Sequence, residues 1–136
     1  MRNKLIYALA VVGIVTAGAA YAETKKVPTS TRPDPTVSFA TTIQPIIQTH
    51  CVSCHQNGVD GFIKSGLDLT SYDGLMKGTR FGPVVVAGEP TLSNLLTLID
   101  GRADKSLKMP HNSRKKLPWR DRNMVRIWIT QGAKNN

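Results

Sequence analysis

Cysteine is scarce in this sequence, which has only two among 136 residues, at positions 51 and 54. A zinc site built on paired cysteines would need a second C-x-x-C, and the chain has none. The chain also has no internal repeat, and its nine acidic residues stand against 18 basic ones. Any cysteine chemistry is therefore confined to one short segment.

That segment reads Cys51-Val52-Ser53-Cys54-His55, and its spacing is the attachment signature of c-type haem. The two thiols reach the two vinyl groups of one porphyrin and become thioethers, while the adjoining imidazole is carried under the iron as an axial ligand. A thioredoxin-like dithiol and a zinc site use some of the same residue types and are the alternatives. Because the motif occurs once, we expect one covalently attached haem c, with iron ligated by His55.

The first 22 residues have the pattern of a secretory signal peptide. A basic start is followed by an apolar stretch at 5–18 and an A-x-A cleavage site at 20–22. Since haem is attached to such motifs outside the bacterial inner membrane, an export signal is what the motif requires. We expect a periplasmic or otherwise exported protein, which is membrane-anchored if the signal stays uncleaved.

The rest of the chain predicts one domain. Residues 23–37 hold three prolines and little to bury, so we expect a flexible polar, proline-rich tail. The domain then spans 38–133, followed by a disordered C-terminus at 134–136. A core of this size needs the buried face of a large apolar cofactor.

The spacing of apolar residues predicts an all-α fold. Helices are expected at 38–50, 71–77, 92–100 and 118–131, and the segment 80–90 is expected to be a buried loop or a very short strand. Pro45 should either kink the first helix or stand where its regular part begins. The last helix has a wide apolar arc, which indicates packing on the first helix and proximity to the haem: Met124, Val125, Ile127, Trp128 and Ile129.

These features together resemble a small class I cytochrome c and are most similar to planctomycete-type cytochrome c domains. The resemblance covers residues 39–133 and rests on the C-x-x-C-H motif, Gly66-Leu67-Asp68-Leu69, Gly82 to Gly88, Lys108-Met109-Pro110 and a closing Trp128-Ile129. It implies N- and C-terminal helices that cross around one haem, with a histidine on one haem face and a methionine on the other. It also suggests the carbonyl of Pro83 as the acceptor for the second ring nitrogen of His55.

The second axial ligand has five candidates, which are Met76, Met109, Met124, His50 and His111. Met76 and Met124 lie on apolar helix faces, where methionine usually packs in a core. Met109 stands in a polar stretch before a stiff proline, and no helical stripe accounts for a thioether there. We therefore expect Met109 to be the ligand, with His111 or an open position as alternatives.

Positive charge gathers after Asp104. The net charge is +9, and eight basic residues beyond Asp104 are opposed only by Asp121: Lys105, Lys108, Arg114, Lys115, Lys116, Arg120, Arg122 and Arg126. Such a run is either a solvated surface or a docking site for an acidic redox partner or an anionic membrane surface. Nucleic acid is not expected as a partner of an exported haem protein.

The function that fits these expectations is one-electron transfer, not enzymatic catalysis. With His55 and Met109 on the iron, no axial position is left for O₂ or peroxide. The alternatives are a haem-based sensor or small-ligand binder with a displaceable or absent methionine, and an electron-delivering subunit of a larger oxidoreductase. No pattern in the sequence predicts an oligomeric state.

Overall fold

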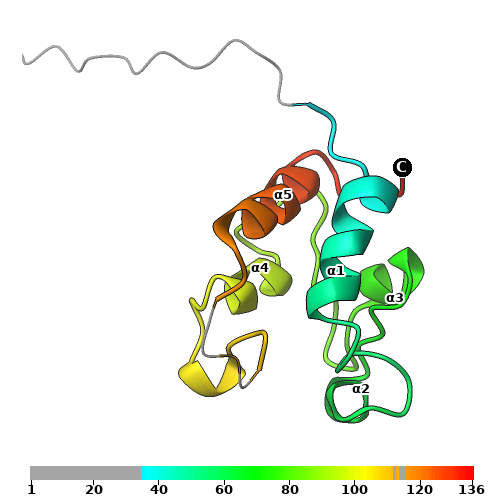
Figure 1. Cartoon of the computed structure of the whole chain (residues 1–136), viewed down its shortest axis with the longest axis vertical. Coiled ribbons are helices and arrows are strands. Elements are labelled where there is room, and N and C mark those ends of the chain that lie inside the picture. Colours follow the sequence, from blue (N-terminus) through cyan, green and yellow to red (C-terminus); the bar gives the residue numbers. More distant parts are fainter. Residues whose placement is uncertain (1–34, 112, 114–115) are drawn as a thin grey trace, which may run out of the picture. The chain divides into compact units, whose positions relative to one another are not determined.

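The computed structural model describes residues 35–111, 113 and 116–136. These residues form a helical domain without strands, which confirms the all-α fold class, and the only β-type pairing in them is an isolated bridge between Thr79 and Gly82 (Figure 1). The elements in order are η1 (Phe39–Ile43), α1 (Gln44–His50), α2 (Asp60–Ser65), α3 (Tyr72–Lys77), α4 (Asn94–Ile99), η2 (Lys105–Leu107) and α5 (Trp119–Thr130).

The signal peptide expected at 1–22, and most of the tail expected after it, lie outside the described residues. Within the described ranges, none of the helices has both the length and the apolar character needed to cross a bilayer.

The first helix begins with a wide π-helical turn before it becomes regular. The N–H of Ile43 donates to the carbonyl of Ser38 at 3.2 Å, and the N–H of Gln44 donates to that of Phe39. Pro45 stands in the first turn of α1, where a missing N–H costs no intrahelical bond. Of the two expected outcomes for Pro45, the structure has the second, in which the regular helix begins at the proline.

Two short helices end where the sequence predicts. Ser71 caps α3 by accepting the N–H of Gly74 at 3.0 Å, and Gly78 ends the helix with φ +79°. Gly101 follows α4 with φ +67°. The helix expected at 92–100 begins later than predicted, at Asn94, and Leu92 is 65% exposed before its first residue.

The loop between α3 and α4 is buried around Val84 and Val85, as expected, and hydrogen bonds of Ser93 hold it. The hydroxyl of Ser93 accepts the N–H of Val86 at 2.9 Å and donates to the carbonyl of Glu89 at 2.9 Å. Because this side chain is fully buried and fully occupied by the loop, it does not cap α4. Of the two expected forms of this segment, the structure has the buried loop, and the hydrogen bonds of Ser93 hold it in place.

The first and last helices meet through an aromatic cluster. Phe39 of η1 lies 5.7 Å from Trp128 of α5 and 5.1 Å from Tyr72 of α3, measured between ring centroids. Trp128 is fully buried, and aromatic rings at such distances contribute stability beyond the area they bury. This contact confirms the expected packing of the last helix on the first.

Both ends of the described chain extend the folded domain further than expected. Val37 is buried and its N–H donates to Oε1 of Gln131 at 2.8 Å. Asn136 accepts the N–H of Phe39 at Oδ1 and the N–H of Ala40 at its backbone oxygen, so it satisfies the open start of η1. Residues just outside the domain expected at 38–133 thus donate and accept hydrogen bonds at its first and last helices, and Asn136 serves as a cap.

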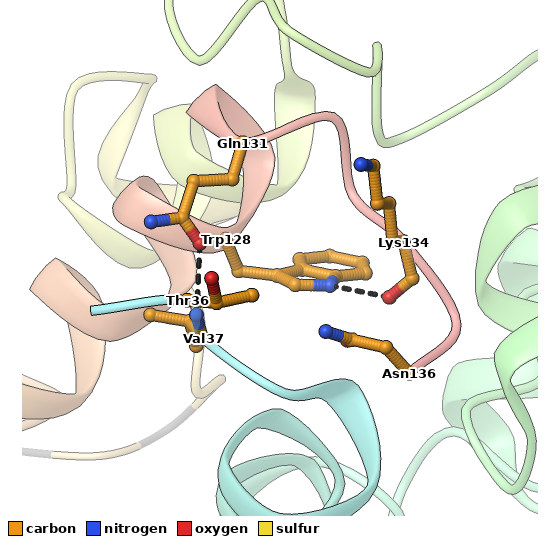
Figure 2. A pocket seen from close by; sticks show the side chains of 6 residues that line it. All are labelled: Thr36, Val37, Trp128, Gln131, Lys134 and Asn136. Carbon is orange, nitrogen blue, oxygen red and sulfur yellow. Dashed lines mark hydrogen bonds between the residues drawn. The ribbon is translucent and has the colours of Figure 1, made fainter. Parts of the chain in front are cut away.

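These terminal segments line an open pocket of about 280 Å³ (Figure 2). Its walls include the indole of Trp128, whose Nε1 donates to the carbonyl of Lys134 at 2.9 Å, and the side chain of Gln131, which reaches Val37. None of the candidate haem ligands lines this pocket. It belongs to the junction of the two termini and not to the predicted cofactor site.

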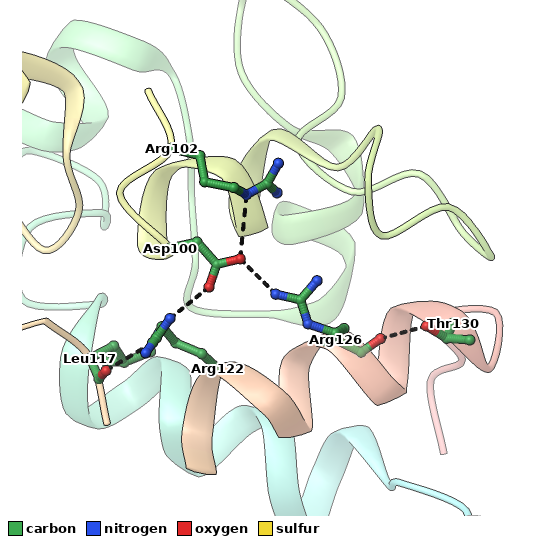
Figure 3. Close-up of polar contacts among 6 residues, drawn as sticks. All are labelled: Asp100, Arg102, Leu117, Arg122, Arg126 and Thr130. Atoms are coloured by element: carbon green, nitrogen blue, oxygen red, sulfur yellow. Dashed lines mark hydrogen bonds and ion pairs between the residues drawn. The ribbon is translucent and has the colours of Figure 1, made fainter. Parts of the chain in front are cut away.

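A carboxylate shared by several arginines joins α4 to α5. Asp100, at the end of α4, has an 8% exposed side chain. Its oxygens accept Nη1 of Arg122 at 2.9 Å and Nη2 of Arg126 at 2.6 Å, and Nε of Arg102 lies 3.5 Å away (Figure 3). Burial raises the pKa of Asp100, but the hydrogen bonds and charges of Arg122 and Arg126 outweigh burial and hold that pKa below its usual value.

We expect Asp100→Asn to lower the free energy of unfolding by about 2 kcal/mol at pH 7, because hydrogen bonds to charged groups are lost. A depressed carboxyl pKa stabilises the fold fully above its unfolded value of about 4 and progressively less as the pH falls through its folded value. The difference in free energy of unfolding between wild type and Asp100→Asn, measured by denaturant titration, should therefore become smaller at acid pH. Glu89→Gln replaces an exposed carboxylate and should have the same free energy of unfolding as wild type. A difference for Asp100→Asn that does not change with pH would contradict this role of Asp100.

Candidate haem site

The two cysteines and the histidine lie on tight turns that continue directly from α1. The N–H of Cys51 donates to the carbonyl of Ile47 at 2.9 Å. The N–H groups of Cys54 and His55 then both donate to the carbonyl of Cys51, at 3.1 and 3.0 Å. The backbone thus holds both thiols and the imidazole within one short, hydrogen-bonded segment, as the attachment motif requires.

Neither cysteine is in a disulfide, and the two thiols have different surroundings. Cys54 is exposed, whereas Cys51 is half-buried and packs against the hydrophobic core. Burial, with a smaller contribution from Cys54, raises the pKa of Cys51 to about 11. A dithiol oxidoreductase needs the opposite, a thiol whose lowered pKa makes it a thiolate near neutral pH. The structure therefore disfavours the dithiol alternative.

The side chain of His55 is half-buried. Its Nδ1 is buried with no hydrogen-bond partner in the described part of the chain. Burial lowers the pKa of His55, while the backbone of Leu67 opposes this effect by favouring the protonated ring. The carbonyl of His55 accepts the N–H of Leu69 at 2.8 Å. A ring with a lowered pKa is neutral at pH 7, which is the form that ligates a metal.

The second ring nitrogen of His55 has no acceptor in the described part of the chain. A metal-ligating histidine usually donates its other ring N–H to a backbone carbonyl or a carboxylate, and Nδ1 of His55 is buried without such a partner. Pro83 is exposed, and its backbone packs closely on Gly78 at the end of α3. The assignment of the Pro83 carbonyl as the acceptor stays a prediction.

Met109 lies on the loop that follows η2. Its N–H donates to the carbonyl of Leu98 at 3.2 Å, which ties this loop to α4, and its side chain is half-buried against the core. Met76 and Met124 pack against the same core from α3 and α5, as their apolar faces predict. None of the described contacts joins Met109 to His55, so the pairing of these two ligands stays a prediction.

The two other histidines have surroundings of their own. Nε2 of His50, at the end of α1, lies 3.4 Å from Oδ2 of Asp121 in the first turn of α5. This contact gives the first and last helices a polar link in addition to the aromatic one. His111 is exposed.

The basic residues near the end of the chain are partly neutralised. Arg122 and Arg126 share the carboxylate of Asp100, a counterion that precedes the basic run in the sequence. Lys105, Lys116 and Arg120 are exposed, whereas Lys108 donates to the carbonyl of Ser113 at 3.2 Å. Arg114 and Lys115 lie outside the described residues. The positive surface is thus formed mainly by the exposed side chains before and at the start of α5.

The donor set of the motif fits a covalently attached haem. It consists of two free thiols three residues apart and an imidazole whose pKa is lowered by burial and whose Nδ1 is buried without a partner in the described residues. Sequence reasoning missed α2, which begins five residues after His55. The one residue in the sequence that could have indicated this helix is Gly66, which ends it with φ +76°.

A family model described as Planctomycete cytochrome C matches residues 51–112. The match begins at the first cysteine of the motif and extends past Met109, so it confirms the resemblance deduced from the motifs. No curated protein and no solved structure matches the chain. The matched model describes a cytochrome c, so the match supports a haem-binding site at the C-x-x-C-H motif, with Cys51 and Cys54 at the required spacing.

Proposed function

We propose that this protein is an exported electron carrier with one covalent haem c. Cys51 and Cys54 would hold the haem through thioethers, and His55 and Met109 would be its axial ligands. When bound, the haem iron supplies a one-electron couple whose potential depends on its axial ligands and on their surroundings. The protein would be periplasmic or otherwise exported, because residues 1–22 have the pattern of a secretory signal.

The observation that carries this proposal is the state of the attachment segment. Both thiols are free, and the carbonyl of Cys51 accepts hydrogen bonds from the N–H groups of both Cys54 and His55. This turn holds two thiols and an imidazole within five residues, which is the arrangement that one haem needs for two thioethers and an iron ligand. A zinc site on the same residues would need a further ligand, and the chain has no third cysteine.

The role of Met109 in this proposal is to occupy the iron position opposite His55. The loop that carries Met109 is tied to α4 through Leu98, and Pro110 follows Met109, so the thioether would be presented from a restrained backbone. With both axial positions taken by side chains, O₂ and peroxide have no position to bind. The protein would then exchange electrons without substrate chemistry.

The partner that fits the surface is an acidic redox protein. Exposed lysines and arginines before and at the start of α5 create a field that attracts a negatively charged partner. An anionic membrane surface offers the same charge and would guide the carrier along the membrane. Nucleic acid is not proposed, since the charge is accounted for by redox docking.

A kinetic experiment with a small anionic oxidant tests this function. Hexacyanoferrate(III) should oxidise the reduced protein with transfer of one electron per chain, and the bimolecular rate should fall steeply as ionic strength rises. Charges on the surface are screened over a Debye length of about 8 Å near physiological salt, which is why the rate is salt-sensitive. Lys105→Glu together with Lys116→Glu should slow this oxidation.

The matched control makes the same change of charge elsewhere. Lys64→Glu together with Lys77→Glu alters two exposed lysines on α2 and α3 and should slow the reaction less. The spectrum should be unchanged in both double variants. Equal rates in the two double variants would show that the basic run does not border the site of electron transfer, and the absence of one-electron oxidation would refute the carrier itself.

A further inference from the structure

Helix α2 approaches the attachment segment through a glycine. Its third residue, Phe62, donates its N–H to the carbonyl of Cys54 at 3.3 Å. A Cβ on the preceding residue, Gly61, would lie 2.5 Å from the oxygen of Cys54 and 3.2 Å from Cε1 of the His55 ring. Real Cβ atoms essentially never come as close to another atom as 2.5 Å, so only glycine fits between α2 and the motif.

The contact at Cε1 is informative because of its place in the imidazole. Cε1 is bonded to both ring nitrogens, so any group that presses on it must turn or shift the nitrogen that would ligate iron. On the other side, the carbonyl of His55 is held by the N–H of Leu69 at 2.8 Å. The nearer clash is with the Cys54 peptide group, at 2.5 Å for its oxygen and 2.9 Å for its carbon, so a Cβ at Gly61 would displace both that group and the ring of the adjoining His55.

Helix α2 is held firmly enough to set this distance. The hydroxyl of Ser65 donates to the carbonyl of Gly61 at 2.5 Å and accepts the N–H of Leu67 at 3.1 Å. The guanidinium of Arg80 donates to the carbonyl of Ile63 at 2.6 Å, and the N–H of Arg80 donates to the carbonyl of Ser65 at 2.9 Å. The helix is thus linked to the segments on both of its sides.

We infer that Gly61 is a positioning residue for His55. The bare backbone of α2 at this point sets the plane of the imidazole and the strength of its bond to iron. This inference rests on the proposed function, since His55 must be an iron ligand for its plane to matter. The residue acts through His55 and does not touch the iron.

The test is Gly61→Ala in the mature haem protein from a host that attaches c-type haem. We expect the haem methyl resonances of the oxidised protein to shift in the paramagnetic NMR spectrum, because they report the plane of the axial imidazole. The reduction potential should shift as well. The ratio of haem to protein should be unchanged, because the thioethers form before the folded protein brings α2 against the attachment segment.

Gly74→Ala is the matched control. Gly74 also lies inside a six-residue helix, and a Cβ there would lie 2.5 Å from the carbonyl oxygen of Asp68. Both variants should lose stability from the same kind of clash, but only Gly61→Ala should shift the haem methyl resonances and the potential. Equal shifts in the two variants, or a loss of stability in Gly61→Ala without any shift, would overturn the inference.

A second variant covers the case in which Gly61→Ala takes up no haem. Ser65→Ala removes the hydroxyl that holds the carbonyl of Gly61 and adds no volume, so it should shift the same resonances by a smaller amount. An unchanged spectrum in Ser65→Ala would then overturn the inference. A wild-type protein without attached haem would instead refute the proposed function, so the two failures are distinguishable.

Discussion

Replacing Cys51 and Cys54 together by alanine should abolish covalent attachment of haem. The wild-type protein from a host competent in cytochrome maturation should keep its haem through acid-acetone extraction, and its mass should equal the chain plus one haem. In the double variant that added mass should be lost completely, because no other cysteine exists in the chain to form a thioether. Mass spectrometry and in-gel haem staining measure both outcomes.

Single variants separate attachment from folding. Cys51→Ala or Cys54→Ala alone leaves one thiol and should reduce the yield of attached haem without abolishing it. Ser53→Ala, at the exposed position between the two cysteines, should keep the wild-type mass. A stable wild-type protein that carries no haem and has two titratable thiols would refute the central claim.

The attachment site could be predicted from sequence because its chemistry is local. Two thiols and an imidazole within five residues need only a turn to come together, and hydrogen bonds to the carbonyl of Cys51 make that turn. The caps of α3 were predictable for the same reason, since Ser71 and Gly78 act on backbone groups within a few residues of themselves. Contacts of this kind do not depend on the rest of the fold.

Contacts between distant segments were the ones that sequence reasoning missed. Asn136 completes the start of η1 from the other end of the chain, and Asp100 pairs with arginines on a helix more than twenty residues away. A single asparagine or aspartate can have many roles, and the residues next to it in the sequence do not indicate which distant group it binds.

Helix α2 shows a further reason why prediction failed. It has six residues, one of them glycine, and no buried side chain, so it shows no apolar period. Its stability comes instead from hydrogen bonds to its neighbours, including the one from Phe62 to Cys54. Propensity is a weak guide to so short a helix, because tertiary contacts outweigh it.

Replacing Met109 by alanine should change the haem from a closed to an open site. The oxidised wild-type protein should show the weak near-infrared band of sulfur-to-iron ligation, and Met109→Ala should lose that band. The variant should bind carbon monoxide when reduced and cyanide when oxidised. Its potential should fall by a substantial part of the roughly 0.8 V over which axial ligands can set haem potentials, because a thioether favours the reduced iron.

Met76→Ala is the control that distinguishes ligation from packing. Both methionines are half-buried against the same core, so both substitutions remove similar packing, but Met76 is already accounted for by the apolar face of α3. Met76→Ala should lower stability and leave the near-infrared band and the carbon monoxide reaction unchanged. Rapid binding of carbon monoxide by the wild type, or a spectrum that survives Met109→Ala, would favour a ligand-binding haem sensor. In that case the thioether of Met109 would belong to the core, and the iron position opposite His55 would be the functional site.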